Sequence, residues 1–576
     1  MDEAVTATAT AAAAAVTRAA PEHASFTTQV IDQLKEWVQD AFDQWSLTSS
    51  LLTIFLFGLL LAGTIWAYES ELHPMQLARQ SMRSEMRHPG QSAIYRAAAQ
   101  GFNGLVKGLN VVEDGAPKFS HGRDGDLRDV WRKFAKGNDK GEKSVITTVL
   151  GLEKKVTHDV DSLTRQIALI GDHIAKNGGI RVAVYLPNSI ELLLTVFACA
   201  FYPNLTVILI PYEVPPTELV SMLHRSAADT VVTAPGVFPL DTISESYSAL
   251  RQLIWVVDEG TSSMDWHVAP TGTVSGINVA TWANIVKPSV VAPELSTDTA
   301  TAPGDLVFFW SSEEISRFTQ ANIIAGMAAQ IASTPSSEIF SSKDTFVPAQ
   351  VLTDQFTLTV TLVALFNNAN IVLNSVAGKD ANLSIATQGV PATVIVAAPE
   401  QALVYHNEGA ASISGSIIMK WVHNYRLRLL ENYGVFPHIK GFLAELETAN
   451  APDIGQAPTV PRVLYIAEKV DRKPLMTSQM LSDIRALTSA RVVHAMTSSK
   501  VAGSVAQTLW YDYRLMEGAT AHFGPPAPSV ELWLTDKDKF VTKDFIVEGE
   551  INVKGASVIG GHATLEAIGK INEDTT

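Results

Sequence analysis

Residues 181–212 read RVAVYLPNSIELLLTVFACAFYPNLTVILIPY, and this stretch sets the expected fold. Two apolar runs within it, 181–188 and 206–212, are rich in aliphatic residues, as is typical of parallel strands buried on both faces. Between them, residues 189–200 form an apolar segment of helical length. A strand, a helix and a second strand in this order predict a parallel α/β unit.

The alternation of apolar runs and helical stretches continues through most of the chain. Further buried strands are expected at 230–233, 253–257, 306–310, 371–373, 393–397, 463–466 and 491–494. From Val530 onward the runs become shorter and turns separate them, which predicts antiparallel strands. We therefore expect a large α/β domain over 144–529, with parallel sheets flanked by helices, and a small β-rich subdomain over 530–576.

The composition limits the classes of function. Of the 576 residues, 47% are hydrophobic and 18% are charged, which is ample material for a buried core. The formal net charge of -16 argues against a nucleic-acid partner, because phosphate binding needs clustered Lys and Arg. The one cysteine, Cys199, excludes an intrachain disulfide and a cysteine-based zinc site, and its apolar surroundings predict a buried thiol. The 14 histidines lack metal-ligand spacing, so no metal site is predicted.

The N-terminal part differs in texture from the rest. Residues 1–28 are rich in Ala and Thr and are expected to be a disordered tail, and the apolar spacing over 29–48 predicts an amphipathic helix. Residues 50–66 read SLLTIFLFGLLLAGTIW without a charge, which predicts a transmembrane helix over 49–68, with a buried core helix as the alternative. A polar cytosolic linker is expected over 69–143.

Charge around the uncharged segment predicts its orientation. Basic residues are more frequent after it than before it, and positive charge tends to stay on the cytosolic side of a membrane. The protein is therefore expected to be a single-pass membrane protein with its C-terminal domain in the cytosol. The endoplasmic reticulum is the first expectation for that membrane, followed by the peroxisome and the lipid droplet.

The order of the segments resembles a known family. The stretch 181–234, the strand DLVFFW at 305–310 and GEINVKG at 549–555 follow one another as in the adenylate-forming (AMP-binding) superfamily. The likeness, closest to long-chain acyl-CoA synthetases, covers approximately 150–576. It implies a large domain that binds ATP, forms an acyl-adenylate and passes the acyl group to a thiol. It also implies a small C-terminal domain, which is expected to be absent here.

The phosphate loop of that family is strongly altered. The family's Gly-rich Ser/Thr loop ends in Pro-Lys-Gly, whereas residues 311–322 read SSEEISRFTQAN, without glycine or lysine. Glu313 and Glu314 would repel a polyphosphate. The alternative is a plain strand-to-helix turn capped by Ser312. The resemblance implies a degenerate nucleotide site with the candidate residues Ser311, Ser312, Arg317, Thr319 and Ser499.

Four more places depart from the family pattern. Lys500 stands where the resemblance implies a magnesium-binding Glu, and Ala567 where it implies an Asp that bonds the ribose. The segment implied to contact adenine, 467–471, reads AEKVD and is bulky and charged. The segment implied to lie beside the acyl tunnel, 346–350, reads FVPAQ. No catalytic residue and no metal ligand are therefore predicted.

Two functions follow from the resemblance and its departures. The first is a membrane-anchored, non-catalytic acyl-CoA synthetase homologue, a pseudoenzyme that acts as a lipid-binding or scaffold protein in fatty acid metabolism. The alternative is an active fatty acid–CoA ligase with ATP and Mg²⁺ as cofactors and an atypical phosphate loop. The expected partners are membrane lipid, a fatty acid or acyl-CoA, and a partner protein.

Overall fold

A computed structural model describes residues 46–66 and 80–576 of the chain. It leaves out 86–87, 99–103, 114, 118–119, 139–140, 152–153, 258–271, 275, 379–381, 438–444, 446, 516–519 and 544–545. The tail predicted over 1–28 and most of the helix predicted over 29–48 lie outside the described residues. The chain divides into two compact units, Met1–Glu69 and Ser70–Thr576.

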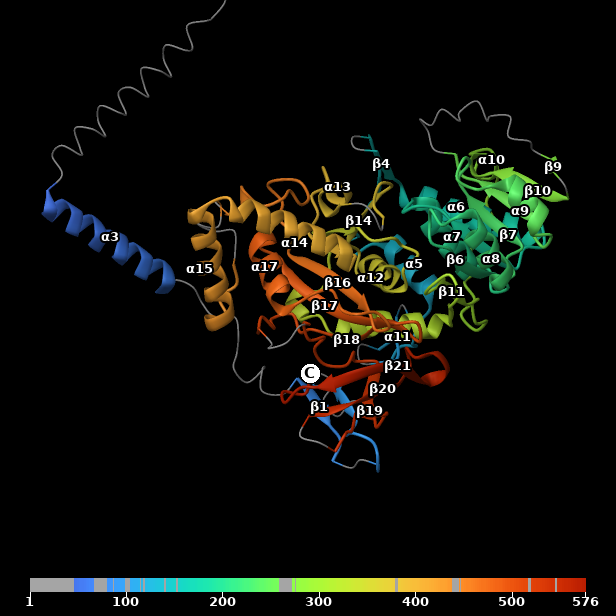
Figure 1. The fold of residues 1–576 in the computed structure, drawn as a ribbon. Coiled ribbons are helices and arrows are strands. Elements are labelled where there is room, and N and C mark those ends of the chain that lie inside the picture. The colour runs from blue at the N-terminus through green and yellow to red at the C-terminus, as the bar shows by residue number, and fades with distance from the viewer. Residues whose placement is uncertain are drawn as a thin grey trace, which may run out of the picture. The chain divides into compact units, whose positions relative to one another are not determined.

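The described part of the first unit is one helix, α3 (Leu47–Trp66), drawn in blue in Figure 1. Its side chains are described as far as Leu59, and the large apolar ones are more than half exposed. Among the helices that the structure describes, none is both long and apolar enough to span a membrane. The transmembrane helix predicted over 49–68 is therefore not supported.

The second unit contains three sheets (Figure 1). The first has eight strands in the order β12-β11-β6-β5-β7-β8-β10-β9, and it is parallel except at its two edge strands. Its strands are β5 (Arg181–Tyr185), β6 (Thr206–Leu209), β7 (Thr230–Thr233), β8 (Gln252–Trp255), β9 (Gly272–Val274), β10 (Ile277–Thr281), β11 (Leu306–Phe309) and β12 (Ile315–Phe318). Helix α7 (Ile190–Phe201) joins β5 to β6, and the Ser189 side chain accepts a hydrogen bond at its start. The parallel α/β unit predicted over 181–212 is confirmed.

The second sheet also has eight strands, in the order β18-β17-β16-β15-β13-β14-β3-β4. It too is parallel in its interior and antiparallel at both edges. Its strands are β3 (Ile146–Leu150), β4 (Lys154–His158), β13 (Thr345–Pro348), β14 (Asn370–Asn374), β15 (Val394–Ala397), β16 (Val463–Lys469), β17 (Arg491–Ser498) and β18 (Val501–Gln507).

The third sheet is antiparallel, in the order β1-β2-β19-β20-β21. Its strands are β1 (Ser81–Arg83), β2 (Tyr95–Ala97), β19 (Val530–Thr535), β20 (Val547–Gly555) and β21 (His562–Ile571). The antiparallel strands expected over 530–576 are present. Two further strands of this sheet come from the segment that was predicted as a linker.

The prediction of a linker over 69–143 is wrong for the residues that the structure describes from Gln80 onward. Besides β1 and β2, this segment forms helix α5 (Leu127–Lys136), which begins at the capping residue Asp126. Leu127, Trp131 and Phe134 recur at helical spacing and are at most 1% exposed. They join the main hydrophobic cluster of the unit, so the segment is part of the folded domain.

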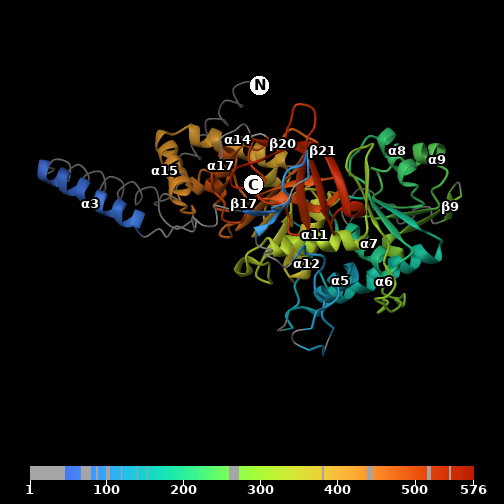
Figure 2. The same cartoon turned by 90° about the horizontal axis from the view of Figure 1, so that it is seen from below.

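The helices cover both faces of the two large sheets. They are α6 (Val160–Lys176), α8 (Pro216–Ser226), α9 (Leu240–Ser246), α10 (Trp282–Ile285), α11 (Gln320–Ala332), α12 (Gln355–Phe366), α13 (Leu383–Thr387), α14 (Pro399–Ser414), α15 (Ile417–Tyr433) and α17 (Ser478–Thr488), with short 3₁₀ turns at Ser336–Glu338 and Ile559–Gly561. One apolar cluster unites α5, α6, α7, α11 and α12 with strands of both large sheets. Helices α8 and α9 cover the other face of the first sheet, and α14, α15 and α17 that of the second (Figures 1 and 2).

A buried asparagine joins the ends of the two large sheets. Asn188 follows β5 and is 1% exposed. Its side-chain Nδ2 donates to the carbonyl oxygens of Pro348, at 3.1 Å, and Gln350, at 2.8 Å, both at the end of β13. Its Oδ1 accepts from the Leu352 backbone N–H at 2.7 Å. One side chain thus satisfies three backbone groups where the carboxyl ends of the two sheets converge.

Replacement of this residue, Asn188→Ala, removes all three hydrogen bonds and leaves buried polar groups unpaired. Because each unpaired group costs about 1–3 kcal/mol, we expect the free energy of unfolding to fall by roughly 3 kcal/mol. Urea denaturation followed by circular dichroism measures the change. The exposed Asn432→Ala is the control. Equal unfolding midpoints for the two variants would show that the joint does not depend on Asn188.

A buried ionic cluster fastens α15 to the neighbouring helices. His423 on α15 contacts Glu447 at 2.5 Å and Asp483 on α17 at 3.3 Å, and Arg426 also pairs with Glu447. His406 on α14 contacts Asp483 at 2.8 Å. Burial opposes the protonation of His423, but the hydrogen bonds to Asp483 and Glu447 outweigh it and raise its pKa to about 9. The hydrogen bond to Asp483 likewise raises the pKa of His406.

These raised pKa values predict that stability depends on pH. The folded chain binds protons at His423 more tightly than the unfolded chain, whose histidine pKa lies near 6.5. The stabilisation is complete below about pH 6 and is lost as the pH rises toward about 9. We expect the urea midpoint to fall over this range and the fall to be smaller in His423→Gln. The exposed His88→Gln is the control, and it should leave the slope unchanged.

Candidate functional site

Two cavities adjoin near the end of β16. The larger, of about 630 Å³, lies between the end of the second sheet and the antiparallel sheet, and we call it the subdomain cavity. The smaller, of about 370 Å³, lies at the carboxyl ends of the parallel strands, and we call it the strand-end cavity. Lys469 and Arg472 line both of them. In open α/β sheets, ligands bind at this carboxyl edge.

The strand-end cavity is walled by residues that end four strands. Trp310 follows β11, Ala398 follows β15, Glu468 belongs to β16 and Thr497 to β17. Ser311 and Ser312 line it as well, and so does Gln350, from the segment implied to lie beside an acyl tunnel. Its charged lining is mixed, so it does not favour one sign of ligand. The charged residues are Glu218, Asp354, Glu400, Glu468, Lys469, Arg472 and Lys473.

The segment in the place of the phosphate loop is a closed β-hairpin. Strands β11 and β12 pair antiparallel, and the Trp310 N–H donates to the Glu314 carbonyl at 3.0 Å across the turn. The Ser311 hydroxyl accepts from the N–H groups of Glu313, at 3.3 Å, and Glu314, at 3.1 Å. These N–H groups bond within the turn, whereas phosphate binding needs N–H groups that face the ligand. The predicted turn capped by Ser312 is thus a hairpin in which Ser311 accepts the hydrogen bonds.

Lys469 ties this hairpin to the end of β16. Its Nζ donates to the Trp310 carbonyl at 2.7 Å and lies 4.1 Å from the centre of the Trp310 ring. The Trp310 indole N–H donates to Asp471 at 3.0 Å. Burial lowers the pKa of Lys469. The segment implied to contact adenine therefore packs directly on the hairpin.

Glu468 is a buried carboxylate with a full set of donors. It is 3% exposed and accepts from the N–H groups of Leu475, at 2.7 Å, and Met476, at 3.0 Å. The His494 Nε2 lies 3.0 Å from it, and the Thr497 hydroxyl donates to its backbone carbonyl at 3.0 Å. All of these bonds hold the chain after β16 in place, which gives Glu468 a structural role beneath the two cavities.

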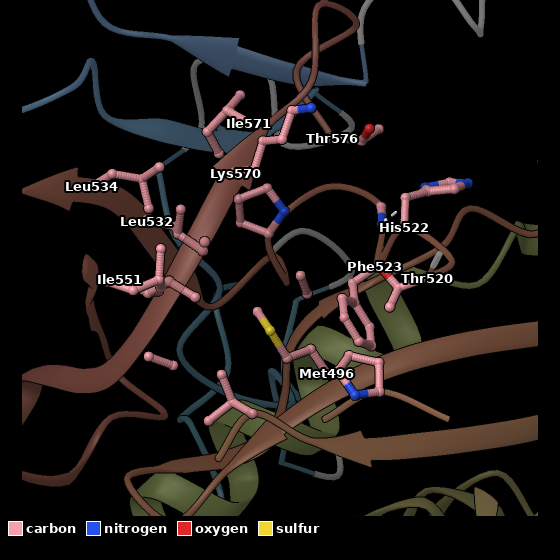
Figure 3. Close-up of a pocket in the computed structure, with 18 of the residues that line it drawn as sticks. Met496, Thr520, His522, Phe523, Leu532, Leu534, Ile551, Lys570, Ile571 and Thr576 are labelled. Atoms are coloured by element: carbon pink, nitrogen blue, oxygen red, sulfur yellow. Dashed lines mark hydrogen bonds between the residues drawn. The ribbon is translucent and has the colours of Figure 1, made fainter. Parts of the chain in front are cut away.

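The subdomain cavity has an apolar body. Figure 3 shows Leu532, Leu534 and Ile551 of the antiparallel sheet on one side, with Met496 and Phe523 opposite them. These five side chains are part of the small core between the β-rich sheet and the end of the second sheet. Met496, Leu532, Leu534 and Ile551 are at most 8% exposed, so an apolar chain would contact them through the small surface that they leave to the cavity.

The rim of the subdomain cavity carries polar and charged groups. Lys570 lines the cavity and is exposed, whereas the His522 side chain, drawn to its right in Figure 3, is only 7% exposed. Burial lowers the pKa of His522, which favours its neutral form near pH 7. The lining cations are Lys469, Arg472 and Lys570, and the lining acids are Asp471 and Glu566. Glu566 already pairs with Lys500 at 3.0 Å and Lys469 with Trp310, which leaves Arg472 and Lys570 as the cations that could meet an anionic group.

The structure separates the candidate nucleotide residues. Ser311 and Ser312 are brought together at the strand-end cavity, whereas the other three candidates are outside both linings. Arg317 is on the edge strand β12, with its side chain 59% exposed and paired with Asp305 at 2.6 Å. Thr319 caps α11 by accepting from the Asn322 N–H. Ser499 lies in the turn between β17 and β18.

Other altered positions acquire structural partners. Lys500 lies in the β17–β18 turn, where its Nζ donates to the Thr564 carbonyl at 2.8 Å and contacts Glu566. Ala567 lines the subdomain cavity. Sequence reasoning missed Arg472 and Lys570 as lining residues. Their position just after β16 and within β21 was the available signal, since strand ends and edges line cavities.

The hairpin offers a polyphosphate no matched donors. Among the residues that the structure describes, no group of three or more His, Cys, Asp or Glu side chains could hold a metal ion. The hairpin N–H groups are bonded internally, and Glu313 and Glu314 lie exposed on the same turn. Polyphosphate placed there would meet negative charge without matched donors.

No family model matches the sequence, and no curated protein matches it. Solved structures do resemble the fold. VinN matches with a TM-score of 0.51 at 14% identity, over 78% of this chain and 97% of that one. A benzoate CoA ligase from Burkholderia xenovorans LB400 matches with a TM-score of 0.51 at 13% identity, over 75% and 72%. The anthranilate CoA ligase AuaEII, in complex with anthranoyl-AMP, matches with a TM-score of 0.51 at 11% identity, over 76% and 71%.

These identities establish likeness of fold and nothing finer. The benzoate CoA ligase and the anthranilate CoA ligase share this fold, so the fold that the predicted resemblance implied is confirmed. The mixed α/β architecture with parallel sheets flanked by helices is confirmed with it.

Proposed function

We propose that the protein binds a ligand with an apolar chain and an anionic group, such as a fatty acid or its acyl-CoA, and does not activate it with ATP. The observation that carries this proposal is the contact of Lys469 with Trp310. It holds the β11–β12 hairpin, which stands in the place of the phosphate loop, against residues 467–471, the segment implied to contact adenine. The fold supports a carboxylic acid or its CoA ester as ligand, because its solved neighbours include a benzoate CoA ligase and an anthranilate CoA ligase.

The subdomain cavity suits the apolar part of such a ligand. Its volume of about 630 Å³ lies within the usual range of small-molecule sites, and its body is apolar. Each methylene group that leaves water contributes about 0.8 kcal/mol. Binding would therefore strengthen with chain length until the cavity is filled.

The rim suits the anionic part. Lys570 is exposed at the opening, and Arg472 lies where the two cavities adjoin. A carboxylate near two cations is favoured by charge-assisted hydrogen bonds, and Arg can make two of them at once. The strand-end cavity would remain accessible to the polar end of a longer ligand such as acyl-CoA.

An active fatty acid–CoA ligase is the second candidate function. The observation in its favour is that Ser311 and Ser312 line the strand-end cavity, where hydroxyls could meet phosphate. Two observations argue against a ligase. The Ser311 hydroxyl already accepts hydrogen bonds within the turn, and Arg317 lines neither cavity and pairs with Asp305. The ligase would need the hairpin to open and Lys469 to leave Trp310.

Calorimetry on the full chain tests the proposal. Oleate should bind with heat, whereas ATP with Mg²⁺ should give none at millimolar concentration. Ile568 and Lys570 are exposed residues of the cavity lining. Ile568→Glu adds a negative charge and Lys570→Glu reverses a positive one, so each should weaken the binding of the oleate anion about tenfold.

The exposed Lys539→Glu reverses a charge outside the cavity and is the matched control. Micromolar ATP binding would contradict the proposal and favour the ligase. Oleate binding that is equal in all three variants would remove the subdomain cavity as its site.

We also propose that α3 attaches the protein to a lipid surface. Its exposed apolar side chains include Leu51 at 60%, Phe55 at 63% and Phe57 at 67%. Exposed apolar side chains gain about 25 cal/mol per Å² when they leave water for a lipid layer, so this helix favours contact with lipid. This proposal replaces the spanning helix by a surface attachment. That the membrane is the endoplasmic reticulum, and that the chain binds a partner protein, are predictions from the sequence.

Co-sedimentation with phosphatidylcholine vesicles tests the attachment by α3. In the full chain, the double change Leu51→Ser and Phe55→Ser should lower the partition coefficient at least tenfold, since each removes about 2 kcal/mol of apolar transfer. Thr53→Ser is the matched control on the same helix. Unchanged partition of the double variant would show that α3 does not carry the attachment.

A further inference from the structure

The outer face of α15 carries an exposed apolar cluster. Ile417 is 87% exposed, Ile418 66% and Trp421 52%, and all three lie within the first turns of the helix. The Trp421 ring stacks on Tyr425 with centroids 5.7 Å apart and planes 10° apart. We call Ile417, Ile418, Trp421 and Tyr425 the α15 face. Exposed apolar side chains that gather on one side of a helix mark an interaction site.

The exposed charged residues of α15 are both cations. Lys420 lies beside the α15 face and Arg428 lies two turns further along, and both are exposed. Glu431 is the acidic residue of this helix. Its side chain is half-buried, and burial raises the pKa of its carboxyl group, which disfavours the negative form. A positive face on a chain with a formal net charge of -16 is a local departure from the overall charge. It is complementary to an anionic surface.

The inner face of α15 keeps the helix in place. His423 and Arg426 point into the ionic cluster with Glu447 and Asp483, and Val422 is buried. Figures 1 and 2 show α15 at the edge of its layer, with α14 and α17 on one side of it. The exposed residues are therefore held outward on a fixed helix, and contact with a surface requires no unfolding.

The size and composition of the α15 face favour lipid over protein. Ile417, Ile418 and Trp421 are exposed and Tyr425 is only partly so, and together they offer roughly 400 Å², whereas each partner in a standard protein interface contributes about 800 Å². Shallow insertion into a bilayer needs no such area. Trp and Tyr prefer the interfacial layer of a membrane, aliphatic tips enter the acyl region, and nearby Lys and Arg contact anionic head groups.

We propose that the α15 face inserts shallowly into an anionic lipid surface, with Lys420 and Arg428 on the phosphate head groups. This contact is independent of ligand binding in the subdomain cavity, because it uses none of the residues that line it. It is also independent of α3, which belongs to the other unit of the chain.

A site-specific fluorescent label tests the contact in the full chain. Cys199 is 2% exposed and burial raises the pKa of its thiol, so a thiol reagent should spare it. Ile418→Cys then places an environment-sensitive label on the α15 face. On vesicles of phosphatidylcholine with phosphatidylserine, we expect its emission to shift to shorter wavelength. Val291→Cys, at a position that is 90% exposed in a loop, is the matched control and should show no shift.

The outcomes separate the lipid contact from other causes. In the Ile418→Cys protein, adding Lys420→Glu and Arg428→Glu should weaken the response at least tenfold, and pure phosphatidylcholine should give a smaller response than the anionic vesicles. An unchanged label at 418 on vesicles that the chain binds through α3 would overturn the proposal. A shift that appears without vesicles and grows with protein concentration would overturn it too, because it would mark contact between two copies of the chain.

Discussion

The arrangement of the second unit depends on how two parallel sheets are joined at their carboxyl ends. Asn188 makes this joint, since its one side chain satisfies two carbonyls and one N–H at the end of β13. Backbone groups at the end of a buried strand have no ladder partner and no water, so they need a side chain of this kind. Both cavities lie beyond the strand ends that this joint brings together.

Lys469 closes the hairpin against the end of β16. Its ammonium group donates to the Trp310 carbonyl and lies over the Trp310 ring, so a phosphate at this hairpin would have to draw it away from both. The antiparallel sheet gives the subdomain cavity the apolar part of its lining, on which the proposed binding of an apolar chain rests.

The central strands were predictable because they are buried on both faces. Such strands must be continuously apolar, and runs such as 206–209 can hardly be anything else. Strands β1 and β2 were missed, because three-residue strands carry too little pattern. Helix α5 was missed although Leu127, Trp131 and Phe134 have helical spacing, because the charged residues around them suggested a linker.

The candidate site was harder to predict for a different reason. Ser311 and Ser312 follow a strand and line a cavity, but the contact of Lys469 with Trp310 joins residues 159 positions apart, which no local pattern reveals. Arg317 lies outside both linings because β12 pairs antiparallel with β11, and this register turns its side chain toward Asp305. The antiparallel sheet also has a consequence for synthesis. Arg96 of β2 bonds Glu531 of β19, which is 435 residues later in the chain. At the rate of ribosomal synthesis, β2 therefore waits about 20–90 s before β19 is made. During this time β2 is exposed to chaperones and to other nascent chains.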